Sequence, residues 1–94
     1  MFQRIAVTNM PSLDDLITRA KVIEADFIAV MNQVPPNSLK AKRMAQRLQK
    51  SKSIIASLID AKHAAGTPPI FTQLMKGILD CHEKVYRVIK EAPI

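Results

Sequence analysis

The sequence is poor in the residues on which β-sheet proteins depend. Its 94 residues include two glycines and no tryptophan, and aromatic residues account for only 4% of them. β-Sheets need glycine-containing turns and large cross-strand side chains, so this scarcity argues against an all-β fold. A chain of this length forms one domain with one marginally stable core, and we expect residues 1–94 to fold as a single helical domain.

Cysteine and long apolar runs are also scarce. Cys81, the single cysteine, cannot form a disulfide within the chain, which fits a reducing compartment. The apolar run at residues 5–7 is too short for a signal peptide, and no run reaches the ~20 residues that span a bilayer. We therefore expect a cytoplasmic protein that does not enter a membrane.

Acidic residues are missing from the middle of the chain. Residues 27–59 contain no Asp or Glu, whereas the segments before and after them carry nearly balanced charge. The formal net charge of +6 therefore lies on the basic residues of this middle segment. They are Lys40, Lys42, Arg43, Arg47, Lys50 and Lys52. A charge concentrated in this way bears on binding partners rather than on the fold.

Proline and glycine divide the rest of the sequence into three stretches. Pro35 and Pro36 cannot continue a helix, and Gly66 followed by two prolines ends the next one. Ser12, with Asp15 three residues later, predicts a capping box at the start of the first stretch. The expected helices cover about residues 12–34, 38–65 and 68–92, and residues 1–10 are left as an N-terminal arm.

Apolar residues recur within each stretch at alternating spacings of three and four, which is the heptad pattern of packed helices. The first stretch has Leu13, Leu16, Ala20, Ile23, Phe27, Val30 and Val34 at these positions. The second has Ala41, Met44, Leu48, Ser51, Ile55 and Leu58. The third has Phe71, Leu74, Ile78, Cys81, Val85, Val88 and Ala92. Because short connections make consecutive helices antiparallel, the predicted fold is all-α, an antiparallel three-helix bundle with heptad-like seams.

Three polar residues interrupt the apolar faces and are predicted to form one buried layer, namely Glu24, Ser51 and His82. A Glu, a Ser and a His together suggest a hydrolase triad, but that chemistry needs an exposed nucleophile and an oxyanion hole of free N–H donors. N–H groups in the middle of a helix are already used by the helix. We therefore interpret the layer as structural, with Glu24 paired to His82 or to a basic residue, and expect no catalytic residue and no enzyme.

Cys81 and His82 are candidate metal ligands, but neighbouring residues of a helix point in different directions. A metal site needs three or four ligands, and His63 is the only other histidine. We expect no metal and no cofactor, and interpret Cys81 as a small core residue.

The basic residues of the second helix are the most informative feature. Lys40, Arg43, Arg47 and Lys50 recur at spacings of three, four and three, which places them in one stripe beside the apolar face, with Lys42 nearby. The first of these cations stand at the helix N-terminus, where the helix dipole disfavours positive charge, so folding alone does not explain them. Such an N-terminus also attracts anions. Three interpretations stay open: a solvated face, a site for an acidic protein surface, and a site for nucleic-acid phosphate.

A second, weaker stripe lies on the first helix, opposite its main apolar face. It consists of Thr18, Val22, Ala25 and Ala29. These are either ordinary surface residues or a close-packed interface with a second copy or a partner helix. The second interpretation predicts a homodimer.

We expect a small non-enzymatic helical interaction protein, such as an adaptor, a chaperone-like subunit or a regulator. It would bind an acidic surface through the basic face of the second helix, formed by Lys40, Lys42, Arg43, Arg47 and Lys50. The alternative is a nucleic-acid-binding protein that contacts phosphates through the same stripe. Against this alternative, the basic segment has no nearby aromatic residues on which bases could stack, and it fits no familiar nucleic-acid-binding module.

Overall fold

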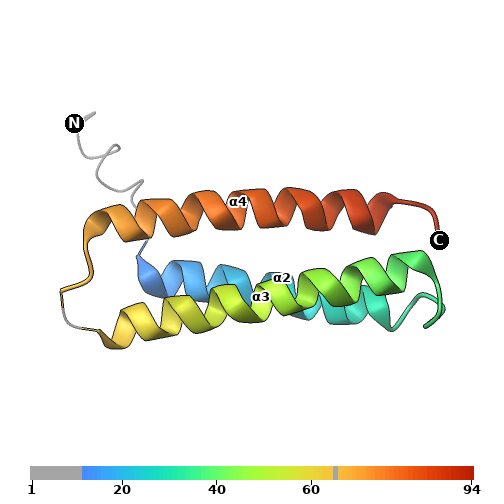
Figure 1. Ribbon diagram of the computed structural model, residues 1–94, viewed down its shortest axis with the longest axis horizontal. Coiled ribbons are helices and arrows are strands. Elements are labelled where there is room, and N and C mark those ends of the chain that lie inside the picture. The colour runs from blue at the N-terminus through green and yellow to red at the C-terminus, as the bar shows by residue number, and fades with distance from the viewer. Residues whose placement is uncertain (1–11, 65) are drawn as a thin grey trace.

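The computed structural model describes residues 12–64 and 66–94. They form three helices, α2 (Leu13–Met31), α3 (Leu39–His63) and α4 (Pro69–Glu91), and each helix contacts the other two. Consecutive helices run in opposite directions (Figure 1), so the predicted all-α antiparallel three-helix bundle is confirmed. The N-terminal arm expected over residues 1–10 lies outside the described residues.

Local signals fix the ends of the helices near their predicted positions. Ser12 forms the predicted capping box, because its Oγ accepts the N–H of Asp15 at 3.1 Å and the Asp15 carboxylate accepts the N–H of Ser12 at 3.3 Å. The Oγ of Ser38 accepts the N–H of Ala41 at 3.1 Å and caps the N-terminus of α3. Gly66 has a left-handed backbone with φ of 76° in the connection between α3 and α4.

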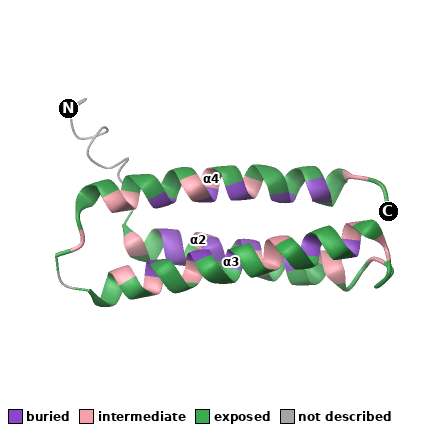
Figure 2. Ribbon diagram, viewed as in Figure 1, coloured by how far each residue is buried: buried purple, intermediate pink, exposed green. Residues whose placement is uncertain are grey.

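The core lies along the line where the three helices meet (Figure 2). Phe27 is fully buried at its centre, and its ring lies 4.5 Å from the ring of Tyr86 in an edge-on contact and 5.4 Å from the ring of His82. Other buried core residues are Leu16, Ile17, Ala20, Ile23, Met44, Ile54, Leu58, Met75, Leu79 and Ile89. The aromatic contacts therefore attach the C-terminal half of α4 to the C-terminal half of α2.

The predicted apolar face of α4 is wrong by about one residue of helix rotation. Leu74 and Val88, expected in the core, are 60% and 70% exposed, and Cys81 is exposed instead of buried. The residues that α4 buries are Met75, Leu79, His82, Tyr86 and Ile89. Apolar side chains occupy two neighbouring faces of α4 at the same spacing, so spacing alone cannot choose between them. The contacts of Tyr86 and His82 with Phe27 decide which face turns inward.

Candidate functional site

Ser51 and His82 meet in the middle of the bundle, as the sequence predicted. Both side chains are buried, at 1% and 2% exposure. The Oγ of Ser51 lies 2.5 Å from Nε2 of His82, and the guanidinium of Arg47 donates to Nδ1 at 2.9 Å. Arg47 and Ser51 are four residues apart on α3 and therefore lie on one side of that helix. Thus α3 holds the imidazole of His82 at both ring nitrogens.

Arg47 determines which ring nitrogen of His82 carries the proton. A guanidinium can only donate hydrogen bonds, so Nδ1 accepts, and Nε2 carries the proton that is donated to Ser51. Burial, together with the positive charges of Arg47 and Lys50, lowers the pKa of His82 to about 4. The neutral ring has no free lone pair with which to take a proton from Ser51. The pair therefore lacks the geometry of a base-activated serine, and it serves as a buried hydrogen-bonded layer.

Glu24 does not join this layer in the way that the sequence suggested. Its side chain on α2 is only half-buried, and it forms no hydrogen bond with Ser51 or His82. The charged residue that forms a hydrogen bond with His82 is Arg47, and not Glu24 as expected. A half-buried cation beside His82 is acceptable because the imidazole is neutral and accepts its hydrogen bond.

The predicted basic stripe divides into two groups in the structure. Lys40 and Arg47 are half-buried and form hydrogen bonds inside the bundle, so the stripe as a whole does not face outward. Lys42, Arg43 and Lys50 are exposed and form no ion pair with any described residue. Of the five cations assigned to the predicted binding face, these three are the ones available to a partner.

Lys40 has a structural role that a view of α3 alone could not show. The antiparallel arrangement places the N-terminus of α3 beside the C-terminus of α4. The ammonium of Lys40 donates to the backbone oxygens of Lys90, at 2.5 Å, and Ala92, at 2.9 Å. These are orphan carbonyls at the negative end of the α4 dipole, where a cation is favourable. The expectation that folding does not explain Lys40 is therefore wrong.

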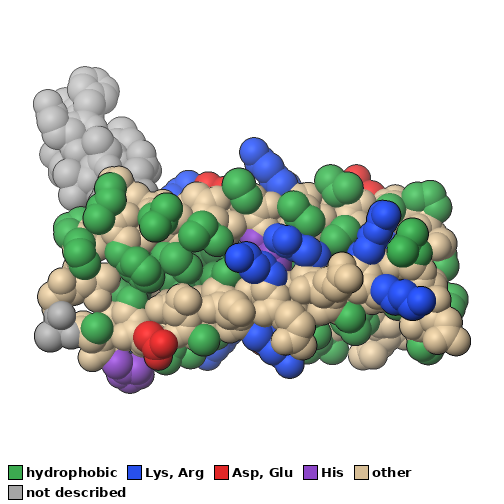
Figure 3. All heavy atoms as spheres, in the orientation of Figure 1, with side chains coloured by type: hydrophobic (Ala, Val, Ile, Leu, Met, Phe, Trp, Pro, Cys, Tyr) green, Lys and Arg blue, Asp and Glu red, His purple; other side chains and the backbone are tan. Residues whose placement is uncertain are grey.

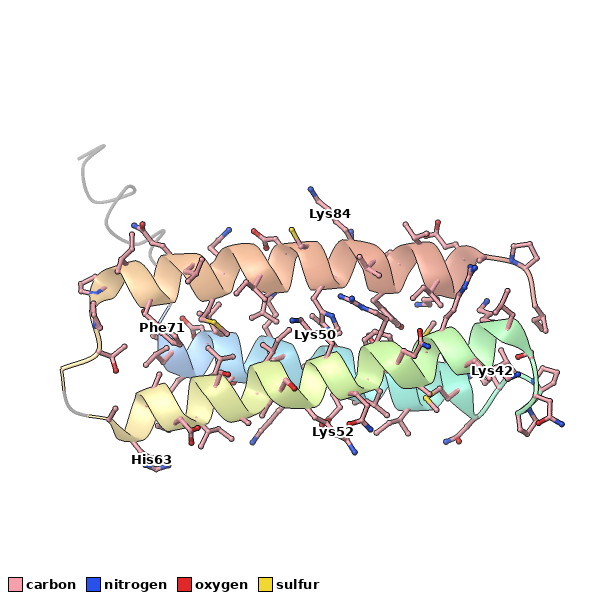
Figure 4. All side chains as sticks on the ribbon, in the orientation of Figure 1. Lys42, Lys50, Lys52, His63, Phe71 and Lys84 are labelled. Carbon is pink, nitrogen blue, oxygen red and sulfur yellow. The ribbon has the colours of Figure 1, made fainter. Side chains whose placement is uncertain are left out.

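An exposed apolar stripe runs along α4 on the side of that helix that lies beside α3. We define the α4 stripe as Ile70, Leu74, Cys81, Val85 and Val88, all of them exposed. Asp80 and Glu83 lie on the edge of α4 that contacts α2, so the stripe lies toward the opposite edge, beside α3. Figure 3 shows hydrophobic side chains along this face, with Lys and Arg side chains at its centre. In Figure 4, Lys50 lies on the side of α3 that faces α4, whereas Lys52 points the other way.

The other edge of α4 carries a charged network that sequence reasoning missed. Arg19 of α2 pairs with Asp80 at 2.7 Å and with Glu83 at 2.8 Å. Lys76 and Arg87 pair with the same two carboxylates from within α4. Hydrogen bonds from Arg19 lower the pKa of both Asp80 and Glu83. The i, i+4 spacings of Lys76 with Asp80 and of Glu83 with Arg87 were the available signal.

The remaining sequence-based candidates lie apart from this site. The predicted self-association residues Thr18, Val22, Ala25 and Ala29 are all exposed on α2, and nothing in the structure tests the predicted homodimer. Exposed Cys81 and buried His82 do not form a common site. Within residues 12–64 and 66–94 there is no cluster of three His, Cys, Asp or Glu residues that could hold a metal. None of the three described helices has the length and apolarity of a membrane span.

Comparisons with known proteins give no assignment. No protein-family model matches the chain, and no curated protein or solved structure matches it significantly. The functional argument therefore rests on the face formed by α3 and α4.

Proposed function

We propose that this protein is a small helical interaction protein that binds an acidic protein surface through the outward-facing cations of α3. The observation that carries the proposal is the lack of carboxylate partners for Lys42, Arg43 and Lys50 among the described residues. Asp80 and Glu83 of α4 are by contrast paired with cations of the bundle. Like charges that are held together on one helix oppose each other and are relieved by an acidic partner.

We assign this function to fewer residues than the predicted basic stripe contains. Lys40 and Arg47 hold the bundle together, and we assign partner binding to Lys42, Arg43 and Lys50. Lys50 also faces the α4 stripe. A surface that combines exposed cations with exposed apolar side chains resembles a protein interface, in which apolar contacts supply affinity and charges supply orientation and rate.

A charge-reversal experiment with a matched control tests the proposal. Arg43→Glu/Lys50→Glu and Lys21→Glu/Lys52→Glu make the same change in net charge, and all four positions are exposed. Immobilised wild-type and variant proteins are used to capture binding proteins from a nuclease-treated extract of the source cell. We expect the first variant to lose the main captured protein and the second to retain it. Equal capture by both variants would contradict the proposal.

Salt dependence separates this function from the nucleic-acid alternative. Contacts with phosphates release counterions, so the logarithm of affinity for DNA falls against the logarithm of salt with a slope of roughly −0.9 for each contact. Bulk DNA is titrated with the wild-type protein over a range of salt concentrations. We expect weak binding that the two double variants reduce equally. Strong binding that only Arg43→Glu/Lys50→Glu abolishes would favour the nucleic-acid function instead.

A further inference from the structure

The α4 stripe has the spacing of a surface that packs against another helix. Leu74, Cys81, Val85 and Val88 are exposed, and the partly buried Ile78 fills the gap between the first two. Together these five positions alternate at spacings of four and three, which is the pattern of a heptad seam. They extend over about 21 Å of helix, at the α-helical rise per residue. An additional helix could therefore lie along α4 at the shallow crossing angle of helical bundles.

Cations border this stripe on both sides. Lys50 lies on the side of α3 that faces α4, and Lys84 projects from α4 away from the bundle (Figure 4). Both are exposed, and neither forms an ion pair with a described residue. In a heptad seam, the side chains that flank the apolar positions select the partner by charge. A helix lying on the stripe would meet Lys50 on one flank and Lys84 on the other.

This charge pattern argues against two other occupants. A second copy that docked through the same face would bring Lys50 and Arg43 of one copy toward the same cations of the other, because residues 27–59 hold no carboxylate. The N-terminal residues 1–11 also contain no Asp or Glu, and they add Arg4. Both occupants would bring further positive charge to a basic site.

We infer that the face formed by α3 and α4 binds an amphipathic helix of a partner protein whose apolar side is flanked by Asp or Glu residues. The bound helix would complete a four-helix bundle, with its apolar side on the α4 stripe and its carboxylates near Lys50 and Lys84. This inference rests on the proposed function and names the class of partner and its place on the surface.

A pair of designed peptides tests the inference. Both are helical peptides of about three heptads with Leu at the two apolar positions. One has Glu at the flanking positions, and the other has Lys there, so each repels itself. Binding to the full chain is measured by fluorescence anisotropy. We expect the Glu peptide to bind at least about ten-fold more tightly than the Lys peptide. Equal affinities, or no binding of the Glu peptide, would overturn the inference.

Two matched pairs of variants locate the peptide. Val88→Glu changes the α4 stripe, and Val22→Glu makes the same change at an exposed position of α2. Lys50→Glu and Lys52→Glu are the corresponding pair on α3. We expect Val88→Glu and Lys50→Glu each to weaken binding of the Glu peptide about ten-fold, and the two controls to change it by less than about two-fold. Because all four side chains are exposed, folding is not at risk.

The remaining outcomes separate this inference from the proposed function. If Lys50→Glu weakens binding and Val88→Glu does not, the basic face binds acidic ligands without a helix on the stripe, so only the further inference fails. If neither variant weakens binding, both proposals fail. If deletion of residues 1–11 strengthens peptide binding about ten-fold or more, that segment is the occupant, and the inference is wrong.

Discussion

The two edges of α4 carry charge in different ways. On the α2 side, Arg19, Asp80 and Glu83 form a closed network in which opposite charges meet. On the α3 side, one cation, Arg47, donates to a neutral histidine, and Lys50 forms no ion pair with any described residue. The charges of the first edge are therefore paired within the bundle. The second combines unpaired positive charge with an exposed apolar stripe, as expected of a surface that is completed by another molecule.

The largest effect is expected from removing the histidine at the α3 edge. His82→Ala leaves a cavity beside Phe27 and deprives Ser51 and Arg47 of their partner. We expect it to lower the free energy of unfolding by about 3 kcal/mol. Urea denaturation followed by circular dichroism measures the change. Cys81→Ala, at the exposed neighbouring position, is the control and should be nearly neutral. A similar small effect of both substitutions would show that the buried layer adds little stability.

As the pH is lowered, the contacts of His82 with α3 should weaken before the ion pairs of Arg19 with α4. The pKa of His82 is about 4 in the folded protein against 6.5 for an ordinary histidine, so between these values the unfolded chain binds a proton that the folded protein does not. The contribution of neutral His82 to the free energy of unfolding is therefore fully present above pH 6.5. It falls by up to about 3 kcal/mol as the pH decreases to 4. The contribution of the Arg19 network begins to fall only near the ordinary carboxyl pKa values of 3.8 and 4.5, because the pKa values of Asp80 and Glu83 are lowered from them.

Urea unfolding at a series of pH values checks this order. His82→Leu removes the titrating group, and its stability should be nearly constant over the same interval. A wild-type stability that does not change between pH 6.5 and 4 would show that the folded protein protonates His82 as readily as the unfolded chain.

A smaller effect is expected at the α2 edge. Arg19→Ala breaks two ion pairs whose side chains are about a third exposed, and solvent screens such pairs. We expect a loss of about 1 kcal/mol in the free energy of unfolding, which decreases as salt is added. Lys21→Ala, an exposed cation two residues away, should have no measurable effect. A loss as large as that of His82→Ala would mean that the two edges contribute alike.

The smallest effect concerns the end of α4. Lys40→Met removes the ammonium that binds the carbonyl oxygens of Lys90 and Ala92. We expect a loss of about 0.5–1 kcal/mol, measured by thermal or urea unfolding. Lys42→Met removes the same charge from an exposed site and should leave stability unchanged. Equal effects of both substitutions would show that only the total charge of α3 matters.

Sequence patterns were sufficient to predict the structural features that depend on a single helix. The proline and glycine breaks, the capping box at Ser12 and the periodic core of α2 are local properties, and the structure has them close to where they were expected. The meeting of Ser51 and His82 also followed from counting along antiparallel helices, because both stand near mid-helix.

Features that depend on neighbouring helices could not be predicted in this way. The heptad spacing of α4 is satisfied by two faces, and only packing against Phe27 selects the one that contains Tyr86. The role of Lys40 depends on which helix end lies beside it. The partial burial of Arg47 could not be predicted, because a charged residue beside an apolar face usually faces outward. Its burial depends on a hydrogen-bond acceptor, His82, that comes from another helix.

The position of Cys81 gives the chain a built-in chemical reporter. It is the only cysteine of the sequence, and its thiol is exposed in the middle of the α4 stripe. A maleimide reagent should therefore label the native protein at a single position, without any substitution. A helix that docks on the stripe would cover this thiol and slow its alkylation, whereas a ligand bound elsewhere on the bundle would leave the labelling rate unchanged. Labelling kinetics in a crude mixture would thus indicate whether the surface is occupied.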